Sequence, residues 1–382
     1  MERSVGCGVE DEWSGRSIGN SKLPSFSPTA SLESLKARAA VIRRVRDFFE
    51  SRGFLEVETP VLSRDTVVDR YLEPFVVPVG DDRPWYLQTS PEFAMKRMIA
   101  AGADAVFQIA RVFRRGDFGQ KHNPEFTMLE WYRTGDDDAT GIALLSDLTD
   151  AVLQRGKANR VTLRQLFAEY VQLNPHTAEC RQLRDYAQKS EIAFPESFGP
   201  AEQDRENWVD LIFSERIQPL LGGRQESGDR RPETGVRRQA SGVRRPASGV
   251  LSPESEIPQA PIIVTDWLAS QSQLAKTRRV SDATGDFDVS ERFELFVDGL
   301  ELANGYHELL DAEILLERVR ATNARRSADG KVPLPEESRL LDAMRHGLPP
   351  CCGCAMGLDR LVMAALQTQN IADVIAFPWE RA

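Results

Sequence analysis

The sequence has no apolar run long enough to cross a membrane. A transmembrane helix needs about 20 consecutive apolar residues, and no stretch of this 382-residue chain approaches that length. Residues 1–28 are rich in glycine and serine and have no apolar core segment, which argues against a secretory signal. We interpret residues 1–33 as a disordered tail and expect no membrane partner.

The chain also has few cysteines and no excess of basic charge. Five cysteines are too few and too clustered for a disulfide framework, which favours a cytoplasmic protein. The net charge of −10 argues against a protein that binds nucleic acid mainly through its phosphates, so tRNA is not expected as a partner. The sequence shows no Walker-type phosphate loop, no dinucleotide fingerprint and no Ser-His-Asp arrangement.

Three of the cysteines, Cys351, Cys352 and Cys354, lie almost together. Their spacing does not match a Cys-x-x-Cys clip and no second pair follows, which argues against a structural zinc site. We expect small buried residues at these positions instead.

The hydrophobic pattern predicts helices and strands without regular βαβ units. The predicted helices span residues 32–51, 91–101, 142–153, 163–170, 182–189, 202–217, 311–326, 336–346 and 357–366, and the predicted strands 54–60, 85–89, 105–114, 125–133, 261–265, 291–298, 300–306 and 352–356. Ser90 is the expected N-cap of the second helix. This order indicates an α+β fold in which helices flank an antiparallel sheet.

Residues 222–260 differ in composition from the rest. Gly-Val recurs at 235, 242 and 249, a period of seven, but glycine and proline in the repeats exclude a coiled coil. Because the repeats have too little apolar surface to offset their ordering entropy, we predict a disordered insertion in a domain of residues 34–382. A tether for nucleic acid or an acidic partner through the arginine pairs is the alternative.

Residues 105–133 predict a β-hairpin that carries an arginine into a polar loop. Arginine suits phosphate because its planar fork donates two charge-assisted hydrogen bonds at once. Two interpretations stay open on these residues alone. One is a nucleotide-binding hairpin with Arg114 on a phosphate, and the other is a solvated hairpin with an Arg–Glu pair.

A second hairpin is predicted around Asp298-Gly299, a typical two-residue turn. This register places Glu294 opposite Ala303 and brings Glu294 and Glu301 to one face, about 7 Å apart, where a Mg²⁺ ion could relieve their repulsion. Two solvated glutamates are the alternative. Strict alternation puts Asn304 and Glu308 on the other face, so a common pocket requires a β-bulge, which we predict at Gly305.

The predicted strand 352–356 ends at Gly357, where a helix begins. A helix N-terminus favours phosphate, and Arg360 lies in its first turn. An ordinary acid–base pair of Asp359 and Arg360 at a helix start is the alternative.

Together these segments resemble the catalytic core of class II aminoacyl-tRNA synthetases, specifically the lysyl branch. Residues 32–60 resemble motif 1, residues 113–127 motif 2, residues 357–360 motif 3, and residues 301–309 the lysyl signature. The resemblance covers residues 34–221 and 261–380. The anticodon-binding barrel is missing before motif 1, and segments 89–92, 129–132 and 374–378 resemble the stand-alone lysyl paralogues that modify elongation factor P.

The resemblance implies ATP-dependent activation of lysine or (R)-β-lysine, transfer to a lysine of elongation factor P, and a homodimer formed through motif 1. Arg114 and Arg360 are the implied catalytic residues, with Mg²⁺ on Glu294 and Glu301. The implied ATP-binding residues are Arg114, Asp117, His122, Asn123, Phe126, Glu294 and Arg360. The implied amino-acid pocket consists of Ser90, Glu92, Glu130, Tyr132, Asn304, Glu308 and Ala355, with Glu308 on the side-chain ammonium.

Three features depart from the family pattern. Gly116 stands where motif 2 has a glutamate, and Asp117 is its candidate replacement. Ala355 replaces a glycine, which fits a β-amino acid, and the insertion 222–260 is additional. Two other functions therefore stay open: charging of tRNA by a truncated enzyme, and a non-catalytic protein that binds an aminoacyl-adenylate.

Overall fold

The computed structural model describes residues 26–80, 83–195, 198–199, 205–223, 260–282 and 285–382. Residues 1–25 of the predicted tail and 224–259 of the predicted insertion lie outside these ranges. The division of the chain into a tail, one domain and an insertion therefore stays a prediction. In the described ranges, no helix combines the length and the apolar character of a membrane span.

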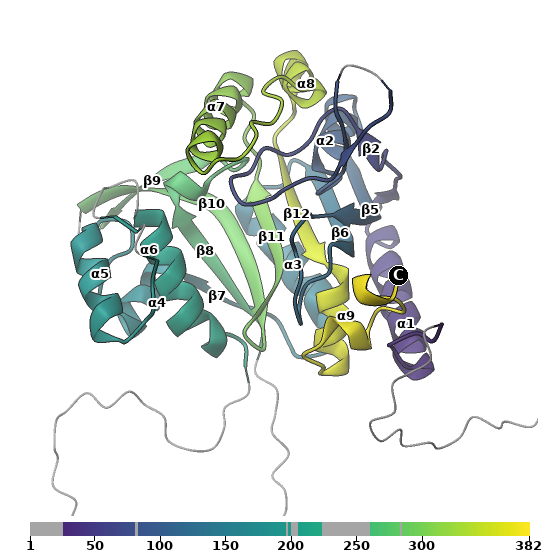
Figure 1. Ribbon diagram of the computed structural model, residues 1–382, viewed down its shortest axis with the longest axis horizontal. Coiled ribbons are helices and arrows are strands. Elements are labelled where there is room, and N and C mark those ends of the chain that lie inside the picture. The colour runs from purple at the N-terminus through teal and green to yellow at the C-terminus, as the bar shows by residue number, and fades with distance from the viewer. Residues whose placement is uncertain (1–25, 81–82, 196–197, 200–204, 224–259, 283–284) are drawn as a thin grey trace, which may run out of the picture.

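A nine-stranded sheet forms the centre of the described fold (Figure 1). Its pairs are antiparallel except for the parallel pairs β1–β5 and β7–β8, so the predicted antiparallel sheet is confirmed for the inner strands and the whole sheet is mixed. The spatial order is β1 (Leu55–Glu56), β5 (Ala105–Phe113), β6 (Glu125–Thr134), β12 (Cys351–Gly357), β11 (Leu300–His307), β10 (Gly285–Val297), β8 (Ile262–Leu268) and β7 (Asn159–Thr162), with β9 (Thr277–Asp282) on β10. A separate small sheet contains β2 (Leu62–Ser63), β4 (Trp85–Leu87) and β3 (Val76–Val77).

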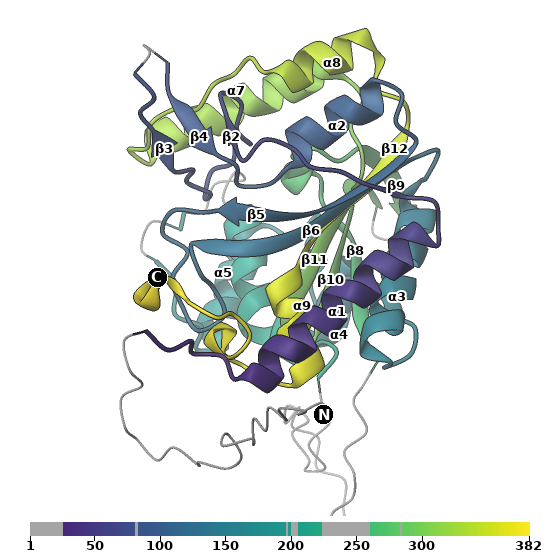
Figure 2. The same cartoon turned by 90° about the vertical axis from the view of Figure 1, so that its right-hand side faces the viewer.

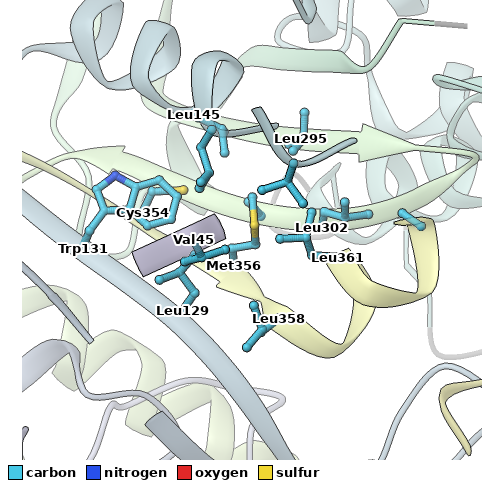
Figure 3. Close-up of a cluster of buried hydrophobic side chains, with 14 of the residues drawn as sticks. Val45, Leu129, Trp131, Leu145, Leu295, Leu302, Cys354, Met356, Leu358 and Leu361 are labelled. Atoms are coloured by element: carbon cyan, nitrogen blue, oxygen red, sulfur yellow. The ribbon is translucent and has the colours of Figure 1, made fainter. Parts of the chain in front are cut away.

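Three helices, α1 (Leu32–Glu50), α3 (Asp138–Leu153) and α9 (Leu358–Leu366), cover one face of the sheet (Figure 2). The core beneath them joins Val45 and Leu145 of the helices to strand residues such as Leu129 and Met356 (Figure 3). Since side chains alternate along a strand, β6 sends Trp131 into this core and its even-numbered residues to the opposite face.

Two groups of helices flank that opposite face (Figure 1). One group contains α2 (Glu92–Ala100), α7 (Ala312–Ala328) and α8 (Arg339–Gly347), which share a core with β5 and β6. The other contains α4 (Leu163–Tyr170), α5 (Cys180–Lys189) and α6 (Arg205–Ile212), which pack against β8. The site described below lies between them.

The structure confirms the predicted helices and strands apart from details of their ends. The predicted helix 202–217 is α6 followed by a π-helical turn, Phe213–Ile217, with residues 202–204 outside the described ranges. The short strands β2, β3, β7 and β9 were not predicted, and only Leu55–Glu56 of the predicted strand 54–60 forms a strand. The predicted cap of α2 was wrong by one position, because the N-cap residue is Pro91, although Ser90 Oγ accepts a hydrogen bond from Glu92 N at 3.0 Å.

The predicted two-residue turn between β10 and β11 is confirmed, with Asp298 and Gly299 at positive φ of 52° and 72°. The predicted register holds next to the turn and then fails, since Glu294 faces Asn304 rather than Ala303. The extra residue is Leu302, so the bulge lies three residues closer to the turn than the predicted position at Gly305. This bulge brings Glu301, Asn304, Tyr306 and Glu308 to one cavity.

Gly305 has a packing role instead of a bulge role. A Cβ atom at this position would lie 2.3 Å from the ring of Phe293 and 3.0 Å from the carbonyl oxygen of Gly353. Both neighbours are buried, so neither can move away without disturbing the sheet.

We predict that Gly305→Ala lowers the free energy of unfolding by about 1–3 kcal/mol, because the methyl group overpacks this site. Urea unfolding followed by circular dichroism measures the change. Gly223→Ala is the matched control, since its Cβ would approach no atom closer than 3.9 Å and should leave stability nearly unchanged. Equal stability of the Gly305 variant and the wild type would contradict the packing argument.

Candidate active site

One cavity of about 600 Å³ is lined by every residue predicted for the site. These residues are Ser90, Glu92, Arg114, Asp117, His122, Asn123, Phe126, Glu130, Tyr132, Glu294, Glu301, Asn304, Glu308, Ala355 and Arg360. They come from α2, from the hairpin β5–β6 and its loop, from β10 to β12 and from the start of α9. The structure thus brings all of them together, while their individual roles stay predictions.

A buried junction connects the three segments that resemble the family motifs. Asp359 at the start of α9 forms an ion pair with Arg38 of α1 at 2.5 Å and accepts a hydrogen bond from Thr127 N of β6 at 2.8 Å. Arg38 also donates to Thr127 Oγ1 at 2.9 Å. Asp359 is therefore not a simple helix-start acid beside a surface base, and the sequence did not indicate the role of Arg38.

Arg114 enters the cavity from the end of β5. Its guanidinium lies 5.0 Å from the centre of the Phe126 ring, and its buried Nε donates no hydrogen bond to any described residue. Burial lowers the pKa of Arg114, and Asp117 partly opposes that change. Because a buried donor without a partner is unfavourable, this arrangement favours an anionic ligand such as a phosphate.

Arg360 lies across the same end of the cavity from Arg114. It donates to the carbonyl oxygen of Glu301 at 2.9 Å and to His122 Nε2 at 2.7 Å. A guanidinium can only donate, so His122 accepts through a neutral ring, and burial together with Arg360 lowers the pKa of His122. These two hydrogen bonds hold Arg360 in a fixed orientation toward the cavity.

The loop between β5 and β6 is fastened by Asn123. Its side chain donates to the carbonyl oxygen of Glu125 at 2.6 Å and accepts from Trp379 N at 2.9 Å, which ties the loop to the end of the chain. Gly116 adopts a positive φ of 93°, a conformation that favours glycine, and the neighbouring Asp117 lines the cavity. Asp117 therefore lines the cavity one residue after the position of the missing glutamate, and its role as the replacement stays a prediction.

The carboxylates proposed to hold a metal also lie at this end of the cavity. Glu294 is buried and forms an ion pair with Arg292, while Glu301 is half-buried. Burial raises the pKa of Glu294 to about 8, Arg292 opposes this and Glu301 adds to it. The described residues form no cluster of three or more potential metal ligands. Two oxygen donors fit a Mg²⁺ ion that takes its remaining ligands from phosphate and water.

The other end of the cavity is acidic, and its carboxylates are buried. Glu92, Glu130 and Glu308 are only 7%, 1% and 0% exposed. Glu130 accepts from Ser90 Oγ at 2.8 Å and from the hydroxyl of Tyr132 at 2.5 Å. Burial and the charge of Glu92 raise the pKa of Glu130 to about 7, and burial raises that of Glu308 to about 8. Buried carboxylates of this kind favour a ligand with amino groups.

Sequence reasoning missed three basic residues that contact these acids. Lys96 contacts Glu92 and Glu308, Arg292 contacts Glu294, and Arg38 contacts Asp359. Two of them carried a local signal, since Lys96 lies one helical turn after Glu92 and Arg292 lies two residues before Glu294 on the same strand. Arg38 had no local signal, because its partner is more than 300 residues away in sequence.

Comparisons with known proteins agree with this arrangement. The family described as tRNA synthetases class II (D, K and N) matches residues 25–381. A relative from Yersinia enterocolitica named elongation factor P--(R)-beta-lysine ligase is 36% identical over 367 residues, which cover 95% of this chain and 100% of the relative. Relatives with the same name from Salmonella arizonae and Salmonella paratyphi B are 37% identical with the same coverage.

We predict that Asp359→Asn destabilises the fold by about 3–5 kcal/mol, because it leaves Arg38 as a half-buried charge without its partner. Arg38→Met should have a similar effect, and the double variant should lose clearly less than the sum of the two. Chemical unfolding of the four proteins measures this coupling. If the stability losses of the two single variants simply add in the double variant, the ion pair does not join the motifs.

Proposed function

The chain belongs to the class II tRNA synthetases of the D, K and N type, and on that premise we propose that it is an ATP-dependent ligase. It activates lysine, with (R)-β-lysine as the favoured form, and transfers the aminoacyl group to a lysine side chain of elongation factor P. One observation carries this proposal: a single cavity has two arginines at one end and three buried carboxylates at the other. The shared name of the three relatives supports the choice of substrates.

In the proposed first step, the carboxylate of the amino acid attacks the α-phosphorus of ATP and pyrophosphate leaves. Negative charge grows on the α-phosphate, and in this proposal the guanidinium groups of Arg114 and Arg360, which both line the cavity, stabilise it. His122 and Phe126 flank the adenine. A bound Mg²⁺ ion on Glu294 and Glu301 would neutralise phosphate charge.

In the second step, the ε-amine of the acceptor lysine attacks the acyl carbon of the adenylate. The acyl–phosphate bond breaks, AMP leaves, the nitrogen loses a proton and an amide forms. No protein nucleophile is required, so the side chains serve to bind, orient and stabilise charge.

The choice of (R)-β-lysine is supported by Ala355. This residue lies on β12 between Glu130 of β6 and Asn304 of β11, in the floor of the amine end of the cavity. A methyl group at this position reshapes the amino-acid pocket, which fits a β-amino acid. A homodimer formed through α1 and a cytosolic location belong to the same proposal.

Mass spectrometry of elongation factor P tests the proposed function directly. After incubation with ATP, we expect a mass increase equal to the amino acid minus water, and we expect it on a larger fraction of elongation factor P with (R)-β-lysine than with lysine. Charging of tRNA without modification of elongation factor P would favour the truncated synthetase. Absence of amino-acid-dependent pyrophosphate exchange would favour a non-catalytic adenylate-binding protein.

We predict that Arg360→Ala and Glu301→Gln each reduce pyrophosphate exchange by at least about 100-fold. The first change removes a guanidinium that stabilises transition-state charge, and the second removes a carboxylate that would hold Mg²⁺. Circular dichroism should show an intact fold. Arg181→Ala is the matched control, since the Arg181 side chain is 84% exposed and does not line the cavity. Wild-type exchange in either variant would remove the proposed role of that residue.

We predict that the amino acid binds more tightly as the pH rises from about 6 to about 8. The pKa values of Glu130 and Glu308, raised to about 7 and about 8, mean that both carboxyl groups hold protons at the lower pH. An ammonium group needs the ionised form, so binding must release these protons. Calorimetry in buffers of different ionisation enthalpy measures the release. This prediction would be contradicted if neither the dissociation constant nor the number of protons released on binding changed with pH.

A further inference from the structure

Lys96 is a buried lysine that the proposed mechanism does not use. It lies on α2 with 1% of its surface exposed, and its Nζ is 2.6 Å from Glu92 Oε1. It also forms an ion pair with Glu308 and lies 5.7 Å from the centre of the Tyr132 ring. Burial acts to lower the pKa of Lys96, but Glu308 and Glu92 outweigh burial and raise it. Lys96 is therefore a permanent cation that lies behind Glu92 and Glu308, two carboxylates that line the cavity.

Lys96 also leaves an acceptor free for a ligand. It contacts Oε2 of Glu308, while Oε1 of Glu308 is buried and accepts no hydrogen bond from any described residue. The absence of a side chain at Gly353 makes room here, since a Cβ atom would lie 2.6 Å from that oxygen. An unpartnered carboxylate oxygen that faces a cavity is a binding position for a donor.

The charges at this end of the cavity can be counted. The described groups that act most strongly on Glu308 are Lys96, Glu92 and Glu130, and those that act on Glu130 are Glu92 and Lys96. Once Glu130 and Glu308 have lost their protons, three ionised carboxylates against one ammonium leave two negative charges. A ligand with two ammonium groups balances this number, whereas a ligand with one leaves a buried carboxylate unpaired or protonated.

We propose that Lys96 limits the charge of the fully ionised pocket to two negative units and thereby selects a diamino acid over amino acids with one ammonium group. This inference rests on the proposed function and adds a specificity-determining residue to it. Lys96 does not touch the reacting atoms. It holds Glu92 and Glu308 in place and supplies the cation that sets how many ammonium groups the substrate must bring.

The test begins with the wild-type protein and three ligands, measured by calorimetry in the presence of a non-hydrolysable ATP analogue. Lysine has two ammonium groups, while norleucine and 6-aminohexanoate each have one. Both single-ammonium ligands should bind at least about 100-fold more weakly than lysine, the scale of an unpaired buried charge. Binding of either one within about threefold of lysine would overturn the proposal.

The second part compares Lys96→Met with Lys157→Met, a change at an exposed lysine that forms ion pairs with Asp147 and Asp150. Lys96→Met should raise the KM for lysine in pyrophosphate exchange by about 100-fold, leave the KM for ATP nearly unchanged, and move the pH dependence of lysine binding to higher pH. Lys157→Met should change none of these. An unchanged KM for lysine, or an unchanged pH profile, would overturn the proposal.

A double variant separates charge from simple positioning. Glu92→Gln combined with Lys96→Met again leaves two carboxylates, Glu130 and Glu308, and should bind lysine several-fold more tightly than Lys96→Met alone. Weaker binding by the double variant would mean that Lys96 acts only by holding Glu92. If the wild type shows no lysine-dependent exchange, the proposed function fails, whereas calorimetry of lysine binding to Lys96→Met and to the wild type still decides the role of Lys96.

Discussion

The active-site cavity depends on a balance between buried carboxylates and buried cations. Glu92, Glu130, Glu294, Glu308 and Asp359 are each less than 9% exposed, and an isolated ion at such positions would be strongly unfavourable. Lys96, Arg292 and Arg38 offset four of them, and neutral donors hold Glu130. The protein thus keeps a water-poor, acidic site without losing its fold, and retains enough negative charge to attract amines.

The same sheet that builds the core also builds the cavity, because strand residues alternate between its faces. On β6, Leu129 and Trp131 pack under α1 and α3, while Glu130 and Tyr132 line the cavity. On β11 the bulge at Leu302 adjusts this alternation, so Glu301 at the phosphate end and Glu308 at the amine end share one face. A strand without the bulge would turn one of these two carboxylates away from the substrate.

Sequence patterns predicted most of the fold because most of its elements are specified locally. The amphipathic α1, the hairpin β5–β6 and the turn at Asp298-Gly299 each have short-range signals. The location of the bulge and the partners of the buried acids depend on tertiary packing. Gly305 was predicted as the position of the β-bulge. The close ring of Phe293 explains why this residue is a glycine, and the extra residue of the bulge lies elsewhere on the strand. The site residues were grouped correctly, whereas the cations that neutralise them were not predicted.

The placement of the basic side chains explains why the two ends of the cavity attract ligand groups of opposite charge. At the phosphate end, Arg114 has a buried donor without a described partner and Arg360 is held by a neutral histidine, so positive charge is left over for an anion. At the amine end, the single ammonium of Lys96 is shared by two of three carboxylates, so negative charge is left over for a cation. An amino acid with a carboxylate at one end and amines toward the other therefore has one favourable orientation. That orientation directs its carboxylate to the arginines, where the proposed attack on the α-phosphate takes place.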